Sequence, residues 1–329
     1  MSEVTTYAIE NLKSAFGETM SDAAITEIVV NAGGELWTER AGDPCMQRDE
    51  RIIDRATAKS LGQDLAGDNT ISMNNPLAGS DFVHNESLWR AQVVGPPVIE
   101  GGHCLAIRRN VSRAFELQKL TDGVDMKKLL EGRNEADAAV FEARDGGDFH
   151  DFLKAAIAAR WNIIFSGGTG TGKTTWMRAC MAEIDDEDRI ATIEDVYDLH
   201  PKQPNKICMR VTKETTPTDL LKACLRLRPD RIMMGELRGS EAFDYLSVVN
   251  SGHPGSFTTL HASGVDKAMD RLSFMVMQAN KGMGHGEIVE YCRSVIDCIV
   301  QLQRVGSKRG PSEVAIFRKE PPESRTERA

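Results

Sequence analysis

The sequence lacks several features that define whole classes of protein. No apolar run approaches the roughly 20 residues that cross a membrane, and no basic segment followed by an apolar stretch opens the chain, so we expect neither a membrane span nor a secretory leader. The cysteines number seven and include no C-x-x-C pair, which argues against a disulfide framework or a zinc site. These absences favour a protein of the reducing cytoplasm that reaches a membrane only through a partner.

Basic residues are also fewer than acidic residues. Lys and Arg total 40 against 49 Asp and Glu, which gives a net charge of −9, and aromatic residues make up only 6% of the chain. Basic and aromatic side chains are not interleaved, so we expect no direct binding of nucleic acid. The content of 41% hydrophobic and 27% charged residues is that of an ordinary globular protein, and 329 residues suit two domains.

The pattern of apolar runs changes along the chain. Residues 1–131 contain short strands joined by hairpin signals and predict a smaller α+β domain with an antiparallel sheet. Residues 132–150 are charged and poor in large apolar side chains, and we favour a linker with some helix over a solvated helix. Strands alternate with helices over 151–318, which predicts an α/β domain with a mainly parallel sheet. Residues 319–329 are interpreted as a tail.

The stretch FSGGTGTGKTTW contains the full phosphate-loop pattern, Gly167-x4-Gly172-Lys173-Thr174. A strand-like run precedes it and a helix-compatible segment follows, which disfavours the alternative of a glycine-rich turn. In such a loop the backbone N–H groups point at phosphate oxygens, the lysine adds positive charge, and the threonine hydroxyl binds Mg²⁺. The predicted nucleotide contacts in the loop are Gly168, Thr169, Gly170, Thr171, Gly172, Lys173, Thr174 and Thr175.

Two later strands end in acidic residues. The segment RIMMGELRG places Glu236 after an apolar run, and RIATIED places Glu194 and Asp195 in the same way. Ligands of parallel α/β sheets bind beyond the carboxyl ends of the strands. We therefore predict that Glu236 and Glu194 organise the metal, together with Thr174, and the attacking water. The alternatives are a solvated strand-end acid for Glu236 and a helix cap or surface turn for Glu194 and Asp195.

One histidine stands where it can report on a phosphate. His261 ends the strand-like segment GSFTTLHA, and we predict that it senses the γ-phosphate. His253, in the loop before that segment, fits a functional and a structural role equally well. The other histidines considered, which we interpret as structural, are His84, His103 and His285.

Four segments follow one another along the chain: GGTGTGKTT, TIED, GELRGSEAFDYLSVVNSGHPG and GSFTTLHA. They resemble the phosphate loop, acidic box, Walker-B-type segment and histidine box of the secretion NTPase superfamily. Within it the chain most resembles the traffic ATPases of bacterial type IV secretion systems, specifically over about residues 160–275. The four-cysteine zinc module of the type II secretion and pilus-extension branch is absent from the sequence.

The resemblance implies a RecA-like C-terminal domain that hydrolyses ATP with Mg²⁺, with catalytic roles for Glu236, Glu194, Lys173 and His261. It also implies a homo-hexameric ring that powers type IV secretion, conjugative transfer or pilus biogenesis. Its partners would be inner-membrane components of the secretion system, which would hold the ring at the cytoplasmic face. The alternatives are a type II secretion or type IV pilus ATPase, a nucleic-acid motor, and a switch that binds nucleotide without hydrolysing it.

The same resemblance places the nucleotide between the two domains of one subunit and implies phosphate contacts from N-domain arginines. Arg90 in WRAQ and Arg108 in AIRRN match those arginines, and Arg109 is open as a replacement because alternation along a strand turns one of the two inward. The alternative is that they are ordinary strand surface residues. Three further candidates, for the subunit interface, the nucleotide or plain surface salt bridges, are Arg226, Arg228 and Arg238.

Overall fold

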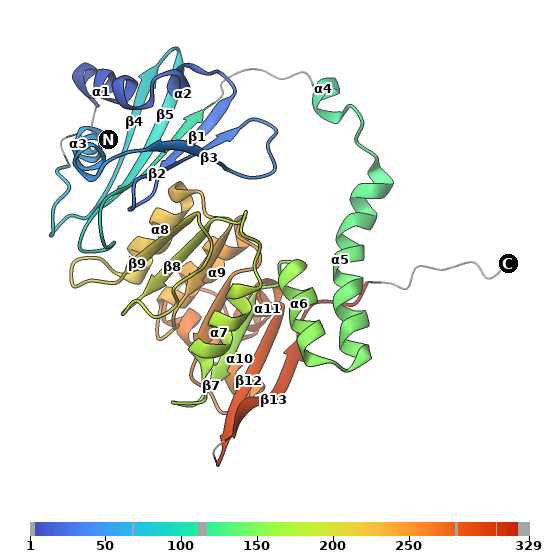
Figure 1. The fold of residues 1–329 in the computed structure, drawn as a ribbon. Helices are drawn as coiled ribbons and strands as arrows, with labels where there is room; N and C mark the ends of the chain where they lie inside the picture. The colour runs from blue at the N-terminus through green and yellow to red at the C-terminus, as the bar shows by residue number, and fades with distance from the viewer. Residues whose placement is uncertain (1–3, 68, 111–116, 280–281, 307, 322–329) are drawn as a thin grey trace. The chain divides into compact units, whose positions relative to one another are not determined.

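The computed structural model describes residues 4–67, 69–110, 117–279, 282–306 and 308–321. The chain divides into two compact units (Figure 1). Unit 1 combines residues 1–113 with 185–253, and unit 2 combines residues 114–184 with 254–329. The domain boundaries expected at residues 131 and 151 stay a prediction.

Unit 1 contains a six-stranded sheet in the order β3-β2-β1-β6-β5-β4, with every neighbouring pair antiparallel. Its strands are β1 Ile25–Val30, β2 Glu35–Arg40, β3 Gln47–Ile52, β4 Leu77–His84, β5 Ser87–Val94 and β6 Cys104–Asn110. Its helices are α1 Thr6–Phe16, α2 Glu18–Ser21 and α3 Arg55–Ala66. The hairpin signal between β1 and β2 therefore forms the expected turn.

Helices α1 and α3 pack on each other, and α3 covers strands β4, β5 and β6. Capping side chains start both helices, since Thr5 accepts from the N–H of Ala8 and Asp54 accepts from two N–H groups in the first turn of α3. The interface is a single apolar cluster that contains the fully buried Trp89 and Phe16. Burying a side chain of this size contributes about 1.5–3 kcal/mol each, which is enough to fix the sheet under the helices.

The remainder of unit 1 is α/β. Strands β8 Ile190–Glu194, β9 Lys206–Arg210 and β10 Arg231–Met234 form a parallel group in the order β10-β8-β9. Helices α8 Pro217–Leu227 and α9 Glu241–Asn250 pack on each other. Every residue of β8 and β10 is buried, as expected for parallel strands covered on both faces.

Unit 2 continues the α/β pattern, with strands in the order β13-β12-β7-β11. Strand β7 pairs in parallel with β11 and β12, and β13 closes the edge antiparallel to β12. The strands are β7 Ile163–Gly167, β11 Phe257–Leu260, β12 Cys298–Val305 and β13 Lys308–Ile316. The helices are α4 Leu117–Thr121, α5 Met126–Gly146, α6 Phe149–Ala158, α7 Lys173–Ala182, α10 Val265–Gln278 and α11 His285–Val295. The mainly parallel α/β fold after a smaller α+β region is confirmed.

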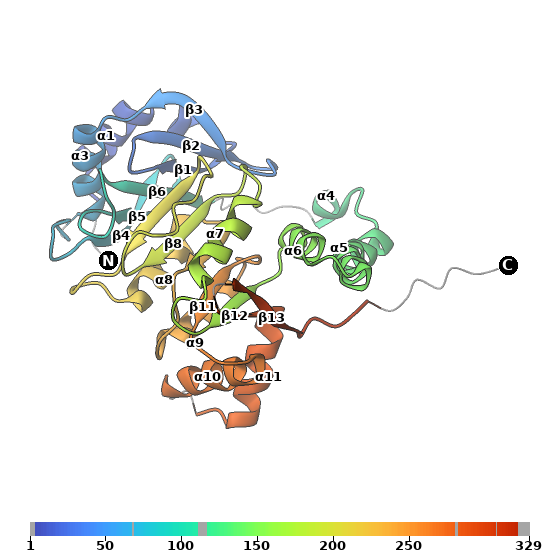
Figure 2. The same ribbon diagram turned by 60° about the horizontal axis from the view of Figure 1, so that its bottom comes forward.

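Most of the predicted linker is helical, because residues 132–146 belong to α5. Figures 1 and 2 show α5 beside α6. The alanine content allows the helix. Val140 and Phe141 near its C-terminal end are buried, and the Phe141 ring contacts Trp161 edge-on. Among the helices that the structure describes, none is long and apolar enough to span a bilayer.

Candidate nucleotide site

The phosphate loop joins β7 to α7 within unit 2. Gly172 has φ +94°, a left-handed conformation that side chains other than glycine rarely adopt. At Gly167 the constraint is space, because an added Cβ would lie 2.6 Å from Thr171 Oγ1 and 2.7 Å from the carbonyl oxygen of Leu302. The backbone conformation at Gly172 and the space at Gly167 therefore require glycine at both positions of the motif.

Helix α7 begins at Lys173 with Gly172 as its N-cap, and no side chain caps it. Its first N–H groups and the positive end of its dipole thus face the loop, where they suit an anion. The Thr171 hydroxyl is used internally, since it donates to the carbonyl oxygen of Gly168 at 2.9 Å. This arrangement is the one that the sequence motif predicts.

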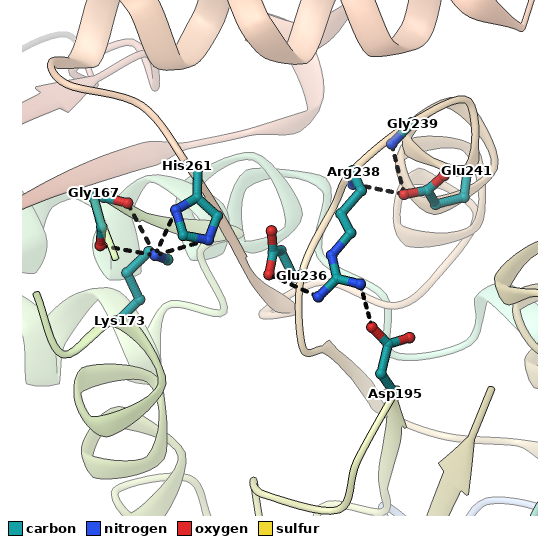
Figure 3. Close-up of polar contacts among 9 residues, drawn as sticks. Gly167, Lys173, Asp195, Glu236, Arg238, Gly239, Glu241 and His261 are labelled. Carbon is teal, nitrogen blue, oxygen red and sulfur yellow. Dashed lines mark hydrogen bonds and ion pairs between the residues drawn. The ribbon is translucent and has the colours of Figure 1, made fainter. Parts of the chain in front are cut away.

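Lys173 and His261 meet at the loop, as Figure 3 shows. The Nζ atom of the buried Lys173 donates to the carbonyl oxygens of Gly167 at 2.9 Å and Gly168 at 3.2 Å. It also lies 3.3 Å from Nδ1 and 3.4 Å from Nε2 of His261. The structure therefore brings together, at the phosphate loop, the two residues that the sequence assigned to the outer phosphates.

In unit 1 the two predicted acids end neighbouring strands. The N–H of Gly235 donates to the carbonyl oxygen of Ile193 at 2.9 Å, which extends the β10–β8 ladder to the residue before Glu236. Glu194 is buried, and its Oε2 accepts from the N–H groups of Asp198 and Leu199, each at 2.8 Å. Glu194 thus anchors the turn after β8, a role close to the turn that the sequence left open as its alternative. Its predicted metal role stays a prediction.

Arg238 connects the acids of this edge (Figure 3). Its guanidinium lies 3.3 Å from Glu236 Oε2 and pairs with Asp195, and the ion pair with Glu236 raises the pKa of the arginine. Glu241 Oε1 accepts from the N–H groups of Arg238 and Gly239 at 2.7 and 2.8 Å. Arg238 therefore holds two carboxylates together, while Glu241 fixes the turn that leads into α9.

The predicted N-domain arginines line a cavity of about 940 Å³ in unit 1, named here the arginine cavity. Its lining residues come from β1, β2, β5 and β6, from the turn between α8 and β10, and from the end of α9. The charged residues that line it are Glu27, Glu39, Arg40, Arg90, Arg108, Arg109, Arg226, Arg228 and Asp230. Six arginines against three acids make this cavity a place suited to anions.

A row of charges crosses the sheet within the arginine cavity. Arg90 stands opposite Arg108, Arg108 opposite Glu27, and Glu27 opposite Glu39. Arg108 Nε lies 3.4 Å from Glu27 Oε1, and Arg228 Nε lies 2.9 Å from Glu39 Oε2. Burial raises the pKa of Glu27 to about 7 against the pull of Arg108, with Glu39 adding repulsion. Sequence reasoning missed Glu27, although a lone acid within the apolar strand ITEIVV is the signal that could have found it.

Arg109 lies on the other face of its strand. It pairs across the sheet with Trp89, and its guanidinium lies 5.2 Å from the centre of the Trp89 ring. It donates to the carbonyl oxygen of Asp22 at 2.9 Å and to Ser87 Oγ at 3.1 Å. Because Arg108 shares a face with Arg90 and Arg109 does not, the geometry favours Arg108 as the partner of Arg90.

The remaining candidates take varied positions. His84 and His103 are buried, which lowers their pKa values and fits the structural interpretation. His253 lines the arginine cavity with Nδ1 2.9 Å from the carbonyl oxygen of Val248, and His285 is exposed beside the Phe274 ring. Arg226 and Arg228 line the arginine cavity as well.

The α/β fold, the phosphate loop and the acids at the strand ends define a RecA-like phosphate-loop NTPase. A match to the family described as "Type II/IV secretion system protein" spans residues 133–312. The type IV secretion system protein VirB11 of Bartonella quintana is 33% identical over 325 residues, covering 90% of this chain and 89% of its own. PtlH of Bordetella pertussis is 34% identical over 298 residues, covering 87% of each chain.

A solved structure agrees with these relatives. The VirB11 ATPase of the Brucella suis type IV secretion system, determined in complex with sulphate, has a TM-score of 0.83 and 31% identity, covering 94% of this chain and 93% of that one. The chain therefore belongs to the type II/IV secretion system family, and it is a nucleotide-binding ATPase of the type IV secretion group.

Proposed function

We propose that the protein binds ATP at the phosphate loop and hydrolyses it. The N–H groups of residues 168–175 cradle the phosphates, Lys173 offsets their charge, Glu236 polarises the attacking water, and His261 senses the γ-phosphate. The observation that supports this most strongly is the position of Lys173 Nζ between loop carbonyls and His261. A γ-phosphate bound there would accept a charge-assisted hydrogen bond from the ammonium, which is stronger than a bond to a backbone carbonyl.

We further propose that Mg²⁺ arrives with the nucleotide, held by the Thr174 hydroxyl with help from Glu236 and Glu194. Among the residues that the structure describes, no cluster of three or more His, Cys, Asp or Glu side chains could cage a metal. That fits Mg²⁺, which keeps several waters and binds through phosphates and one or two protein oxygens. Bound there, the ion would neutralise charge that develops on the phosphate oxygens.

At the level of the cell, we propose a homo-hexameric motor at the cytoplasmic face of the inner membrane, attached through other secretion components. Its cycle would power type IV secretion, conjugative transfer or pilus biogenesis. The relatives named above support this proposal, since VirB11 and PtlH are described as type IV secretion system proteins.

We also propose that the position of the N-domain arginines makes a ring of subunits necessary for hydrolysis. Within unit 1, the arginine cavity is lined by residues 225–230, just before β10, whereas Glu236 follows β10. The four residues of β10 span about 13 Å, and nucleotides bind beyond the carboxyl ends of such strands. We therefore propose that Arg90 and Arg108 reach the phosphates of ATP held by a neighbouring copy, instead of those at the site between the two domains of one subunit that the resemblance implies. Each site then needs two subunits.

Mixing two defective variants tests both proposals. Arg108→Ala keeps the phosphate loop and Glu236, while Glu236→Gln keeps the arginines. In a mixed ring, some sites would combine the intact loop of one copy with the intact arginine of another. We expect phosphate release from Mg-ATP in the mixture to rise well above the mean of the two variants measured alone. A mixture that equals that mean would contradict the two-subunit site, and a wild type inactive with Mg-ATP would contradict the function.

A further inference from the structure

The chain after β11 turns back across the end of β7. Gln301 lies on β12, and β7 separates β12 from β11 in the sheet. Nevertheless the Gln301 Nε2 atom donates to the carbonyl oxygen of Ala262, the residue after His261, at 3.1 Å. The histidine segment, defined as residues 261–265, therefore passes over the end of the strand that leads into the phosphate loop.

Gln301 contacts both sides of this crossing. Its Nε2 atom also lies 3.3 Å from the carbonyl oxygen of Leu302, the same oxygen that leaves room only for glycine at position 167. Leu302 stands opposite Gly167 in the β12–β7 ladder. Gly167 in turn offers its carbonyl oxygen to Lys173. One amide group thus ties the histidine segment to the strand that braces the first glycine of the loop.

The burial of Gln301 argues that its polar group serves a purpose beyond packing. Its side chain is 5% exposed, and its Oε1 atom has no hydrogen-bond partner among the described residues. A buried acceptor in that position costs about 1–3 kcal/mol, which a leucine of similar size would avoid. The N–H donor function has to outweigh this cost.

The hairpin of β12 and β13 holds the other end of the segment too. Glu313 stands opposite Gln301 on β13, and its Oε2 accepts from the N–H of Val265 at 3.2 Å. The hairpin therefore holds the histidine segment through hydrogen bonds at Ala262 and at Val265. Only two residues, Ser263 and Gly264, lie between these two contacts.

We propose that Gln301 is a positioning residue for ATP hydrolysis, which fixes the histidine segment so that His261 stays against Lys173. The inference rests on the proposed roles of Lys173 and His261. Gln301 touches no reacting atom; it acts through the geometry of a residue pair on which turnover depends, where small displacements are costly.

The test compares purified full-length variants in Mg-ATP turnover. Gln301→Leu removes the donor and keeps the volume, and Gln303→Leu on the exposed part of the same strand is the matched control. We expect Gln301→Leu to lower kcat about 10-fold, with KM for ATP changed less than about 2-fold. We expect Gln303→Leu to match wild type, and the exposed Glu313→Ala to show a smaller loss of kcat.

A pH series separates positioning from packing. Gln301→Glu carries no donor when ionised, but its protonated carboxyl can donate to Ala262, and burial raises the pKa of such a group. We expect kcat of Gln301→Glu, relative to wild type, to recover as the pH falls. Folded Gln301→Leu with wild-type kcat would overturn the inference. So would a Gln301→Glu variant whose relative kcat does not change with pH, which decides the case should Gln301→Leu fail to fold.

Lys173→Ala, measured alongside, tells two failures apart. If Lys173→Ala abolishes turnover and the Gln301 variants do not lower it, only the positioning role is wrong. If Lys173→Ala itself retains turnover, the proposed function fails with it.

Discussion

The phosphate loop of unit 2 and the arginine cavity of unit 1 present positive charge in different ways. The loop assembles its donors from consecutive residues, and its lysine is held by backbone carbonyls. The cavity assembles arginines from β2, β5 and β6, from the end of α8 and from the turn after it, and carboxylates hold Arg108 and Arg228. We expect a phosphate to compete with backbone carbonyls for Lys173, and with carboxylates for Arg108 and Arg228. We therefore expect the loop to contribute more to phosphate binding than the cavity does.

The largest effect is expected at the loop. Lys173→Ala removes the buried ammonium from the position where the outer phosphates would lie. We expect phosphate release to fall about 10³-fold, since charge placed at a transition state in a buried site is worth several kcal/mol. Steady-state turnover checks this, with ATP binding measured by calorimetry. A fall of only a few-fold would mean that the cavity, not the loop, dominates recognition.

The second effect concerns stability and belongs to the cavity. Because the pKa of Glu27 in the folded protein is about 7, above its ordinary 4.5, the protonated carboxyl stabilises the fold. That contribution is complete below about pH 4.5 and is lost as the pH rises through 7. Glu27→Gln mimics the protonated form. We expect it to exceed wild type in free energy of unfolding by up to about 3 kcal/mol at pH 8, with little difference at pH 4.5.

Urea unfolding at the two pH values checks this, with Glu50→Gln on the exposed strand β3 as the control. Destabilisation by Glu27→Gln at pH 8 would mean that the ion pair with Arg108 outweighs the burial of the carboxylate.

The smallest effect separates two adjacent arginines. Arg108→Ala should raise KM for ATP about 10-fold, as expected for the loss of one charge-assisted contact to phosphate, and leave the melting temperature nearly unchanged because its side chain is 67% exposed. Arg109→Ala should keep KM and lose about 1–2 kcal/mol of stability, because it packs on Trp89 and bonds to Asp22. The reverse pattern would assign the phosphate contact to Arg109.

The same contrast explains what the sequence could predict. The phosphate loop, with Gly167 and Lys173, could be predicted because one short contiguous motif specifies it, although the distant Leu302 also limits the space at Gly167. The parallel strands could be predicted because strands that are buried on both faces appear in the sequence as continuous apolar runs. Strand β7 leads into the phosphate loop, and β11 ends just before His261. Because these two strands are parallel neighbours, they end at the same edge of the sheet, which brings His261 to Lys173.

The arginine cavity could not be predicted from the sequence in the same way. The row from Arg90 to Glu39 depends on the register of four strands, which no local pattern specifies. The same holds for Gln301, whose partner lies 39 residues away. The linker prediction undervalued helix because the buried apolar residues of α5 that the structure describes, such as Phe141, lie near its end.

The most direct test of the central claim is phosphate release from Mg-ATP by wild type and Glu236→Gln, with particle mass recorded on the same samples. The account predicts turnover by a six-fold particle and a loss of about 10²–10³-fold in the variant, which should still assemble and bind nucleotide. Normal turnover by folded Glu236→Gln would contradict the account, because the carboxylate at the end of β10 would then take no part in hydrolysis.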